Sequence, residues 1–309
     1  MIMFKKLLHN PQSVITAIII VTIIILGLLA PVISPHDPTD TNVAIKYALP
    51  SGEYPLGTDY LGRCTLSRLL HGIFPSVILV MLTVFCVISI GTIIGVVAAY
   101  KGGWVNEIFM RICDIMLAFP TEVMILAFVG IFGLGLTPML VAIILLKWPW
   151  YAVVIRNAAL KYVDKNYIYF SKASGMKGIG VILKHVIPMT LPDIILLASS
   201  NVSSTILLLS GFSFLGLGIQ PPNPEWGNML SEAREVILSH PIQMLPPGIA
   251  IMTVCLSFSL FGDAVRDAMD AKHVSKGIFK TKGGYALGCI VGSAGFGRFG
   301  KKGRTLSDK

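Results

Sequence analysis

Residues 151–193 read YAVVIRNAALKYVDKNYIYFSKASGMKGIGVILKHVIPMTLPD, and this stretch decides how the rest of the chain is interpreted. It is a long basic segment with an apolar run on each side. Its cationic residues are Arg156, Lys161, Lys165, Lys172, Lys177 and Lys184. Gly175 and Pro188 interrupt it. A long basic loop kept between two apolar runs presents a docking surface on one side of a membrane. The sequence therefore raises the question of which partner this docking surface couples to.

The composition indicates that a lipid bilayer is the solvent of this chain. Of its 309 residues, 54% are hydrophobic and 13% are charged, whereas about a quarter of a typical soluble domain is charged. The net charge of +9 is typical of loops that face anionic lipid, and no soluble module interleaves aromatic and basic residues as nucleic-acid binding requires. Five cysteines without a CxxC pair and six scattered histidines predict neither a disulfide framework nor a metal site.

Six apolar runs are candidates to cross about 30 Å of hydrocarbon. We predict membrane helices at residues 13–34, 77–100, 108–132, 139–155, 191–212 and 245–265. The first run has no small-residue cleavage site, so we expect an uncleaved helix. The predicted organisation is an N-terminus (1–12), a first transmembrane helix (13–34), an extracytoplasmic segment (35–76), a five-helix core (77–268) and a tail (269–309) that we expect to be disordered. The core contains the basic loop, which we define as residues 156–190.

Lysine and arginine in the short loops predict the orientation. One side of the predicted membrane collects Lys5, Lys6, Lys101, Arg111 and the cations of the basic loop. The cations of the other side are offset by neighbouring Asp and Glu. We therefore expect both termini and the basic loop to be cytoplasmic.

No catalytic constellation is visible in the sequence. The stretch from Gly295 to Lys301 superficially matches a phosphate loop, but Lys302 follows where Ser or Thr would hold magnesium, and no buried strand precedes it. The motifs of zinc peptidases and serine hydrolases are also missing. We therefore expect that the chain is not an enzyme and does not hydrolyse ATP itself.

Glu122 and Lys147 are the two ionisable residues that the sequence places well inside apolar runs. Ionisable groups within a membrane are costly and usually face a cavity or a partner. Two interpretations stay open. Either the two residues line or pair across a polar translocation path, or they reach the membrane interface by snorkelling.

Three local patterns predict packing or ion pairs. Gly91 and Gly95 form a small-xxx-small face, which we expect to pack within the subunit, although such a face also suits a partner helix. Asp59 and Arg63 are four residues apart, which suits a pair on one helix face. The same kind of spacing occurs at the inner end of the last predicted helix, in Asp263, Arg266 and Asp267.

Within the basic loop we predict a short helix over residues 171–183, interrupted by glycines. A short helix between two membrane helices can lie along the membrane surface and fit a groove on a soluble partner. Motion of the partner then becomes motion of the membrane helices. The alternative is a solvated basic loop that rests on lipid headgroups.

Several stretches together resemble one family of membrane transport proteins. They are Leu56–Arg63 (LGTDYLGR), Asp114–Pro120 (DIMLAFP), Ser213–Gly218 (SFLGLG), Pro221–Gly227 (PPNPEWG), Gly262–Asp267 (GDAVRD), and Gly175 followed by His185-Val-Ile-Pro188. In this order, over residues 10–272, the chain resembles the C-type subunit of the oligopeptide, dipeptide and nickel permeases of ABC importers. Two departures stand out. Tyr169, Phe170 and Ser171 replace the family's Glu-Ala-Ala triplet, and Cys64 stands where Asp is usual.

The resemblance implies an all-α membrane protein with six transmembrane helices and the type I ABC importer (MetI-like) permease fold. It implies a prokaryotic plasma membrane and a heterodimer with a second homologous permease. Two cytoplasmic ATPases that use ATP and an extracytoplasmic solute-binding protein complete the implied assembly. No cofactor, metal or nucleic acid is implied for this chain, and membrane lipid surrounds it. The residues implied in ATPase coupling are Ser171, Lys172, Ala173, Gly175, Lys177, His185 and Pro188.

The stretch Trp148-Pro-Trp150-Tyr151-Ala152, together with the missing triplet, resembles the nickel or metal-chelate permeases more than the peptide permeases. We therefore expect import of nickel or of a metal–chelator complex, and di- or oligopeptide import is the alternative. A secondary transporter is the alternative of another class. It would tend to show inverted repeats with broken helices, and the sequence shows no such repeat.

Overall fold

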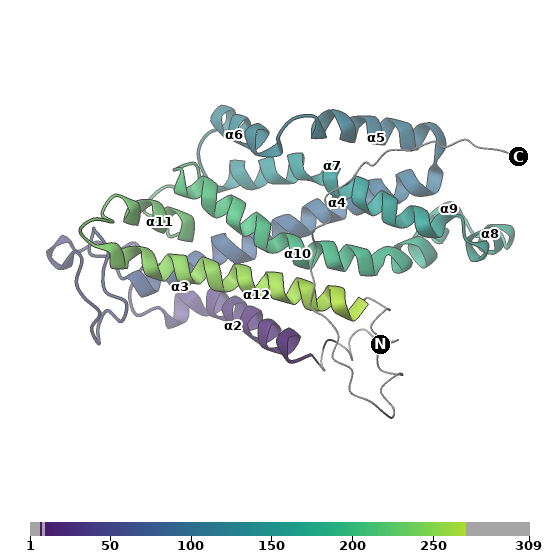
Figure 1. The fold of residues 1–309 in the computed structure, drawn as a ribbon. Helices are drawn as coiled ribbons and strands as arrows, with labels where there is room; N and C mark the ends of the chain where they lie inside the picture. The colour runs from purple at the N-terminus through teal and green to yellow at the C-terminus, as the bar shows by residue number, and fades with distance from the viewer. Residues whose placement is uncertain (1–6, 8–9, 270–309) are drawn as a thin grey trace, which may run out of the picture. The chain divides into compact units, whose positions relative to one another are not determined.

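The computed structural model describes residue 7 and residues 10–269. Its helices in chain order are α2 (Pro11–Ile33), η1 (Val43–Ile45), α3 (Thr65–Ile73), η2 (Phe74–Ile78), α4 (Leu79–Lys101), α5 (Gly103–Leu117), α6 (Thr121–Phe132), α7 (Leu136–Val163), α8 (Asn166–Ala173), α9 (Gly178–Val181), η3 (Ile182–Val186), α10 (Ile187–Phe214), α11 (Trp226–Arg234), η4 (Pro241–Met244) and α12 (Leu245–Met269) (Figure 1). Apart from a β-bridge between Thr58 and Cys64, no strand occurs among these residues. The predicted tail lies outside the described residues beyond Met269.

Five helices or unbroken helical runs are long and apolar enough to cross a membrane: 11–33, 65–101, 136–163, 178–214 and 241–268. They contain five of the six predicted membrane helices, but several extend further. The second begins at Thr65 rather than at Val77, because α3 continues through the π-helical turn η2 into α4. Thr65, Ser67 and Arg68 are buried, which explains why a polar segment that the sequence assigns to a loop is helical and packed.

The third predicted membrane helix, at residues 108–132, is wrong as a single span. α5 and α6 are separate helices whose axes differ by 78°, so together they form a sixth, bent candidate span. The break lies at Pro120, the residue that precedes α6. A proline lacks the N–H that a continuing helix needs, and it disfavours helical backbone at the residue before it. The Phe119–Pro120 dipeptide therefore divides the apolar run.

α4 and α7 contact each other along their length and form the centre of the bundle. A Cβ added at Gly91 would lie 2.7 Å from Cβ of Tyr151, and one at Gly95 would lie 2.5 Å from the carbonyl oxygen of Ala152. Both glycines are therefore needed for the close approach of the two helices. The prediction that this glycine pair packs within the subunit is confirmed.

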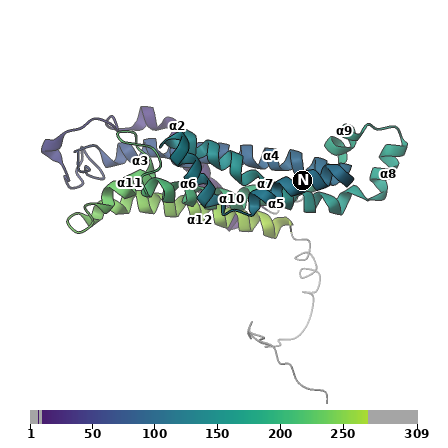
Figure 2. The same cartoon turned by 90° about the horizontal axis from the view of Figure 1, so that it is seen from above.

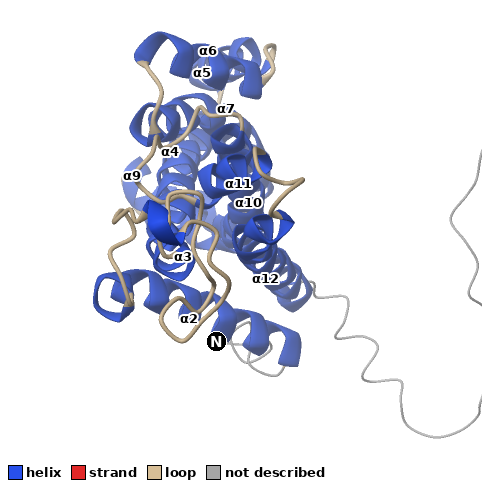
Figure 3. Cartoon of the chain, turned by 90° about the vertical axis from the view of Figure 1, so that its left-hand side faces the viewer, coloured by secondary structure: helices blue, strands red, loops and turns tan. Residues whose placement is uncertain are grey.

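The other helices surround this pair. α10 packs against α4, α7 and α12, and α2 packs against α12 and α3. α5 and α6 lie on one side of α7, and α2 lies on the opposite side of the bundle (Figures 1 and 3). α8 and α9 lie at one end of the bundle, whereas α11, α3 and the 35–64 segment lie at the other end (Figure 2). The bundle thus separates two regions with different chemistry.

Candidate functional site

The basic loop folds as two short helices that follow the extended end of α7. α7 continues to Val163, and α8 begins after a turn at Asp164 and Lys165. The predicted helix over 171–183 is wrong in its bounds, because α8 begins earlier and ends at Ala173 and α9 begins at Gly178, but the predicted interruption at Gly175 is confirmed by the break between them.

Gly175 causes this break. Its φ is +83°, and the N–H groups of Gly175 and Met176 bond to the carbonyl oxygens of Lys172 and Ser171 at 3.0 and 3.1 Å. This is the Schellman pattern of a helix C-terminus, which favours glycine in the left-handed region.

α8 has an inner face and an outer face of different character. Ile168 and Ser171 are buried, whereas the side chains of Tyr169 and Phe170 are 54% and 75% exposed. Five lysines of the basic loop are also exposed, namely Lys161, Lys165, Lys172, Lys177 and Lys184, and the Nζ of Lys172 lies 5.7 Å from the centroid of the Tyr169 ring. We call Tyr169, Phe170 and the exposed lysines of the basic loop the aromatic–basic surface. Exposed large apolar side chains that gather on one surface usually mark an interaction site.

The structure brings together only some of the residues predicted for coupling. Ser171 Oγ lies 3.1 Å from His185 Nε2 and also donates to the carbonyl oxygen of Tyr167 at 2.8 Å. This contact holds α8 against η3, the π-helical turn that precedes α10. Pro188 is the second residue of α10 and directly follows the π-helical turn η3, within one helical run over 178–214. The remaining predicted residues, Lys172, Ala173, Gly175 and Lys177, are exposed along the end of α8 and the following turn.

Glu122 and Lys147 differ in their surroundings. Lys147 is half-buried on α7, and its Nζ donates to Thr205 Oγ1 of α10 at 3.3 Å. Glu122 is exposed in the first turn of α6, directly after the break at Pro120, where a helix N-terminus favours an acidic residue. Glu122 thus lies at a helix start within the bent 103–132 span and on the surface of this chain. No ion pair within 4.0 Å joins the two side chains in residues 10–269.

At the opposite end of the bundle, four charged residues form the arginine cluster: Asp59, Arg63, Arg68 and Glu232. Arg63 Nε lies 2.7 Å from Asp59 Oδ2, and Arg63 Nη2 lies 3.1 Å from Glu232 Oε2. Arg68 Nη1 lies 2.7 Å from Glu232 Oε2 and also pairs with Asp59. Both arginines are fully buried, so two carboxylates neutralise two buried cations. The cluster ties the 35–64 segment and α3 to α11.

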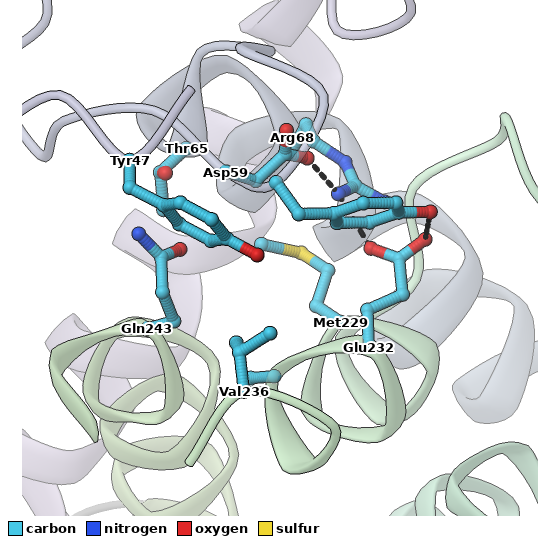
Figure 4. Close-up of a pocket in the computed structure, with 10 residues that line it drawn as sticks. Tyr47, Asp59, Thr65, Arg68, Met229, Glu232, Val236 and Gln243 are labelled. Carbon is cyan, nitrogen blue, oxygen red and sulfur yellow. Dashed lines mark hydrogen bonds and ion pairs between the residues drawn. The ribbon is translucent and has the colours of Figure 1, made fainter. Parts of the chain in front are cut away.

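The Asp59–Arg63 pair is confirmed, but it lies in a turn before α3 rather than on a helix face. Arg68 and Glu232 were missed as its partners. Figure 4 shows Arg68 and Glu232 beside a cavity of about 20 Å³ that Tyr47 and Gln243 also line. This is room for about one water molecule, so the cavity does not hold a transported solute. The second predicted charge pattern, at Asp263, Arg266 and Asp267, forms no ion pair within 4.0 Å among the described residues.

Glu225 anchors the start of α11. It is fully buried, and its carboxylate accepts the N–H groups of Gly227 and Asn228 at 2.9 Å each. Ser76 Oγ of η2 donates to it at 3.1 Å. Burial raises the pKa of Glu225, and these hydrogen bonds oppose the rise. The Pro221–Gly227 motif thus has a structural role, which is to cap α11 and fasten it to η2.

No group of three or more His, Cys, Asp or Glu suited to hold a metal ion occurs in the part of the chain that the structure describes. The long apolar helices define a multi-pass α-helical membrane protein. Comparison with known proteins then shows the family. Residues 91–272 match the family of binding-protein-dependent transport system inner membrane components. Residues 2–50 match the N-terminal transmembrane domain of oligopeptide transport permease C. The chain belongs to this family.

Relatives of known role cover nearly the whole chain. The metal-staphylopine import system permease protein of Staphylococcus aureus is 43% identical over 89% of this chain and 96% of its own length. The dipeptide transport system permease protein of Alkalihalophilus pseudofirmus is 36% identical, over 88% and 90%. The nickel transport system permease protein of Escherichia coli is 34% identical, over 87% and 98%.

Among solved structures, an inward-facing MetNI methionine ABC transporter shares the fold. Its TM-score is 0.54 at 16% identity, over 66% of this chain and 97% of that chain. The predicted all-α type I importer permease fold is therefore confirmed. The chain is a permease subunit of an ABC importer and not an enzyme, as its family shows.

Proposed function

We propose that this chain, with a second homologous permease, forms the path through which an ABC importer takes up nickel or another transition metal bound to a small chelator. The observation that carries the substrate class is the 43% identity, over 96% of that protein, to a metal-staphylopine import permease. A nickel permease is related over a similar length. Di- or oligopeptide import is the second candidate, because a dipeptide permease is 36% identical.

The aromatic–basic surface is the proposed docking site for a cytoplasmic ATPase. Its exposed rings, Tyr169 and Phe170, occupy two of the three positions of the family's Glu-Ala-Ala triplet. The two rings present an apolar contact surface where the family has a carboxylate. The exposed lysines of the basic loop are complementary to acidic residues at the edge of the partner's binding surface. Ser171, at the third position, faces inward to His185 and holds α8 in place. Lys172, Ala173, Gly175 and Lys177 then form the edge of the docking site, and Pro188 lies just after η3 in the helical run that receives the motion.

Lys147 and Glu122 are proposed to line the translocation path. Among the described residues, the half-buried Lys147 ammonium donates a hydrogen bond only to the Thr205 hydroxyl, so it retains donors for an anionic group. A metal chelate that carries carboxylates is such a solute. Glu122 would add a negative charge to the same path, and no ion pair within 4.0 Å joins it to Lys147 in residues 10–269. A residue of this kind steers a solute but does not select the metal.

The proposed assembly has this permease and its homologous partner in the plasma membrane of a prokaryote, surrounded by lipid. Two cytoplasmic ATPases supply the energy by hydrolysing ATP, and an extracytoplasmic solute-binding protein delivers the substrate. Both termini and the basic loop are cytoplasmic, which places the arginine cluster and α11 on the extracytoplasmic side. The excess of cations in the basic loop supports this orientation.

Uptake experiments test the substrate class. Cells that lack this gene are compared with complemented cells for accumulation of radioactive nickel, of nickel with an amino-carboxylate chelator, and of a radiolabelled dipeptide. We expect chelated nickel to accumulate in complemented cells only. Restoration of dipeptide uptake alone would replace the metal proposal by the peptide one. Failure of ATPase subunits to copurify with the permease would refute the docking proposal.

A further inference from the structure

Tyr100, near the end of α4, lies between both short helices of the basic loop. The Nζ of Lys172 on α8 is 4.8 Å from the centroid of the Tyr100 ring, within the range of a cation–π interaction. On the α9 side, a Cβ added at Gly178 would lie 3.3 Å from Cε1 of the same ring. The ring therefore contacts α8 through a cation and touches the start of α9 at a position that leaves little room for a side chain.

The chain itself connects α8 only loosely to its neighbours. The turn at Asp164 and Lys165 separates α7 from α8, and the turn at residues 174–177 separates α8 from α9. Two non-helical turns are places where a displaced α8 can pivot without moving the membrane helices. α9, in contrast, continues through η3 into α10 as one helical run. Movement of the basic loop therefore reaches α10 directly but reaches α7 only through a hinge.

Through Tyr100, movement of the basic loop can reach α7 without passing the hinge, because α4 is closely packed with α7 at Gly91 and Gly95. We propose that Tyr100 is a positioning residue of energy coupling, which braces α8 and α9 against the α4–α7 pair. ATPase-driven movement of the loop then enters this pair instead of being absorbed at the Asp164–Lys165 turn. The proposal rests on the proposed docking of an ATPase at the aromatic–basic surface. The proposal adds a contact through which movement of the basic loop reaches α4, a helix that is not adjacent to the loop in the sequence.

Two roles of Tyr100 have to be separated, namely filling space and holding the Lys172 cation. Tyr100→Phe keeps the aromatic face, and no hydrogen bond of the Tyr100 hydroxyl occurs among the contacts of the described residues, so this variant is the matched control. Tyr100→Leu keeps most of the volume but has no π face. Tyr100→Ala removes both. If Tyr100 acts by holding the Lys172 cation, the Tyr100→Leu and Tyr100→Ala variants should behave alike and differ from Tyr100→Phe.

Cysteine labelling measures the movement without requiring the transported substrate. In a complex whose native cysteines are replaced, single reporters are placed by Ile93→Cys on α4 and by Leu207→Cys on α10. Both native side chains are exposed in this chain, at 65% and 54%. The maleimide labelling rate is measured in proteoliposomes with and without ATP plus vanadate. We expect trapping to change both rates in the otherwise wild-type complex.

The Tyr100→Ala and Tyr100→Leu variants should reduce the trapping effect at position 93 at least fivefold and leave the effect at position 207 intact. Tyr100→Phe should behave as wild type at both positions. Because Lys172 is exposed, Lys172→Gln should keep the fold. We expect it to reproduce the loss at position 93, and the double variant with Tyr100→Ala should be no worse than either single variant.

An unchanged response at position 93 in Tyr100→Ala would overturn the brace while the docking proposal stands. If the losses caused by Lys172→Gln and Tyr100→Ala at position 93 add in the double variant, the proposed role of Tyr100 also fails, because Lys172 would then act through the ATPase and not through Tyr100. If trapping changes neither reporter in the wild-type complex although ATPases are bound, or if no ATPase binds, the docking proposal itself fails. These results are distinguishable from one another, since each has its own pattern at the two reporters.

Discussion

Replacement of Gly95 by alanine tests the packing at the centre of the bundle. The added Cβ would lie 2.5 Å from the carbonyl oxygen of Ala152 and 2.9 Å from the backbone nitrogen of Arg156. Both distances are well below the ~3.5 Å of a relaxed contact, and both neighbours are backbone atoms that cannot rotate away. α4 and α7 must therefore separate, which typically costs about 1–3 kcal/mol.

An alanine in a helix interior is intrinsically more stable than a glycine by about 0.5–1 kcal/mol. The expected net effect of Gly95→Ala is a loss of roughly 1–2 kcal/mol in the free energy of unfolding. Gly211→Ala in α10 is the matched control, because a Cβ at Gly211 meets nothing within 4 Å. It should be neutral or stabilising. Helical content measured by circular dichroism during titration of the purified subunit with a denaturing detergent gives both values.

Equal stability of Gly95→Ala and wild type would refute the close approach of α4 and α7 at this position. A gain as large as that of Gly211→Ala would refute it more strongly. A loss accompanied by unchanged far-ultraviolet helicity at zero denaturant would show that the two helices still form and only their packing has weakened.

Three further predictions concern the two ends of the bundle. Glu225 contributes most to the stability of the fold at pH values below its ordinary pKa of 4.5, and this contribution is lost as the pH rises through its raised pKa in the folded protein. The melting temperature of wild type should therefore fall more with rising pH than that of Glu225→Gln, and an equal fall in both proteins would contradict this. Glu232→Ala leaves two buried arginines with one carboxylate and should cost about 3 kcal/mol in unfolding experiments, whereas Glu235→Ala at an exposed site should cost nothing measurable. Gly175→Val, which cannot easily adopt φ of +83°, should weaken copurification of the ATPase more than Gly175→Asn, and equal effects would exclude a role for the left-handed turn.

Hydrophobic runs predicted the membrane helices well, because burial in lipid requires an apolar composition along the whole span. They did not predict where a helix bends. The run through residues 108–132 is apolar on both sides of Pro120, so hydropathy alone reads it as one helix. The Phe119–Pro120 dipeptide was a signal for the break, and it was not used.

The partners in the arginine cluster were outside the reach of sequence patterns. Asp59 and Arg63 are four residues apart, and their pairing follows from local spacing. Glu232 is 169 residues from Arg63, and only the packing of α11 against α3 brings them together. Likewise, the spacing of Lys172 in the basic loop gave no indication of Tyr100, because that contact depends on where α4 ends relative to α8.

The run from Thr65 to Lys101 is held at its two ends by contacts of different strength. At its start, Arg68 lies in a buried ion-pair cluster, and breaking a buried pair typically costs 3–5 kcal/mol. At its end, Tyr100 contacts the basic loop through an exposed lysine, in an interaction worth about 0.5–1 kcal/mol, and the preceding turns of α4 pack on α7 at Gly91 and Gly95. A force that reaches α4 through Tyr100 would therefore act on the end of the run that is remote from the cluster, while the cluster keeps the other end fixed to α11. The π-helical turn η2, which contains Pro75, lies between the cluster and α4, so the helix has a structural irregularity at the position where such a displacement would bend it.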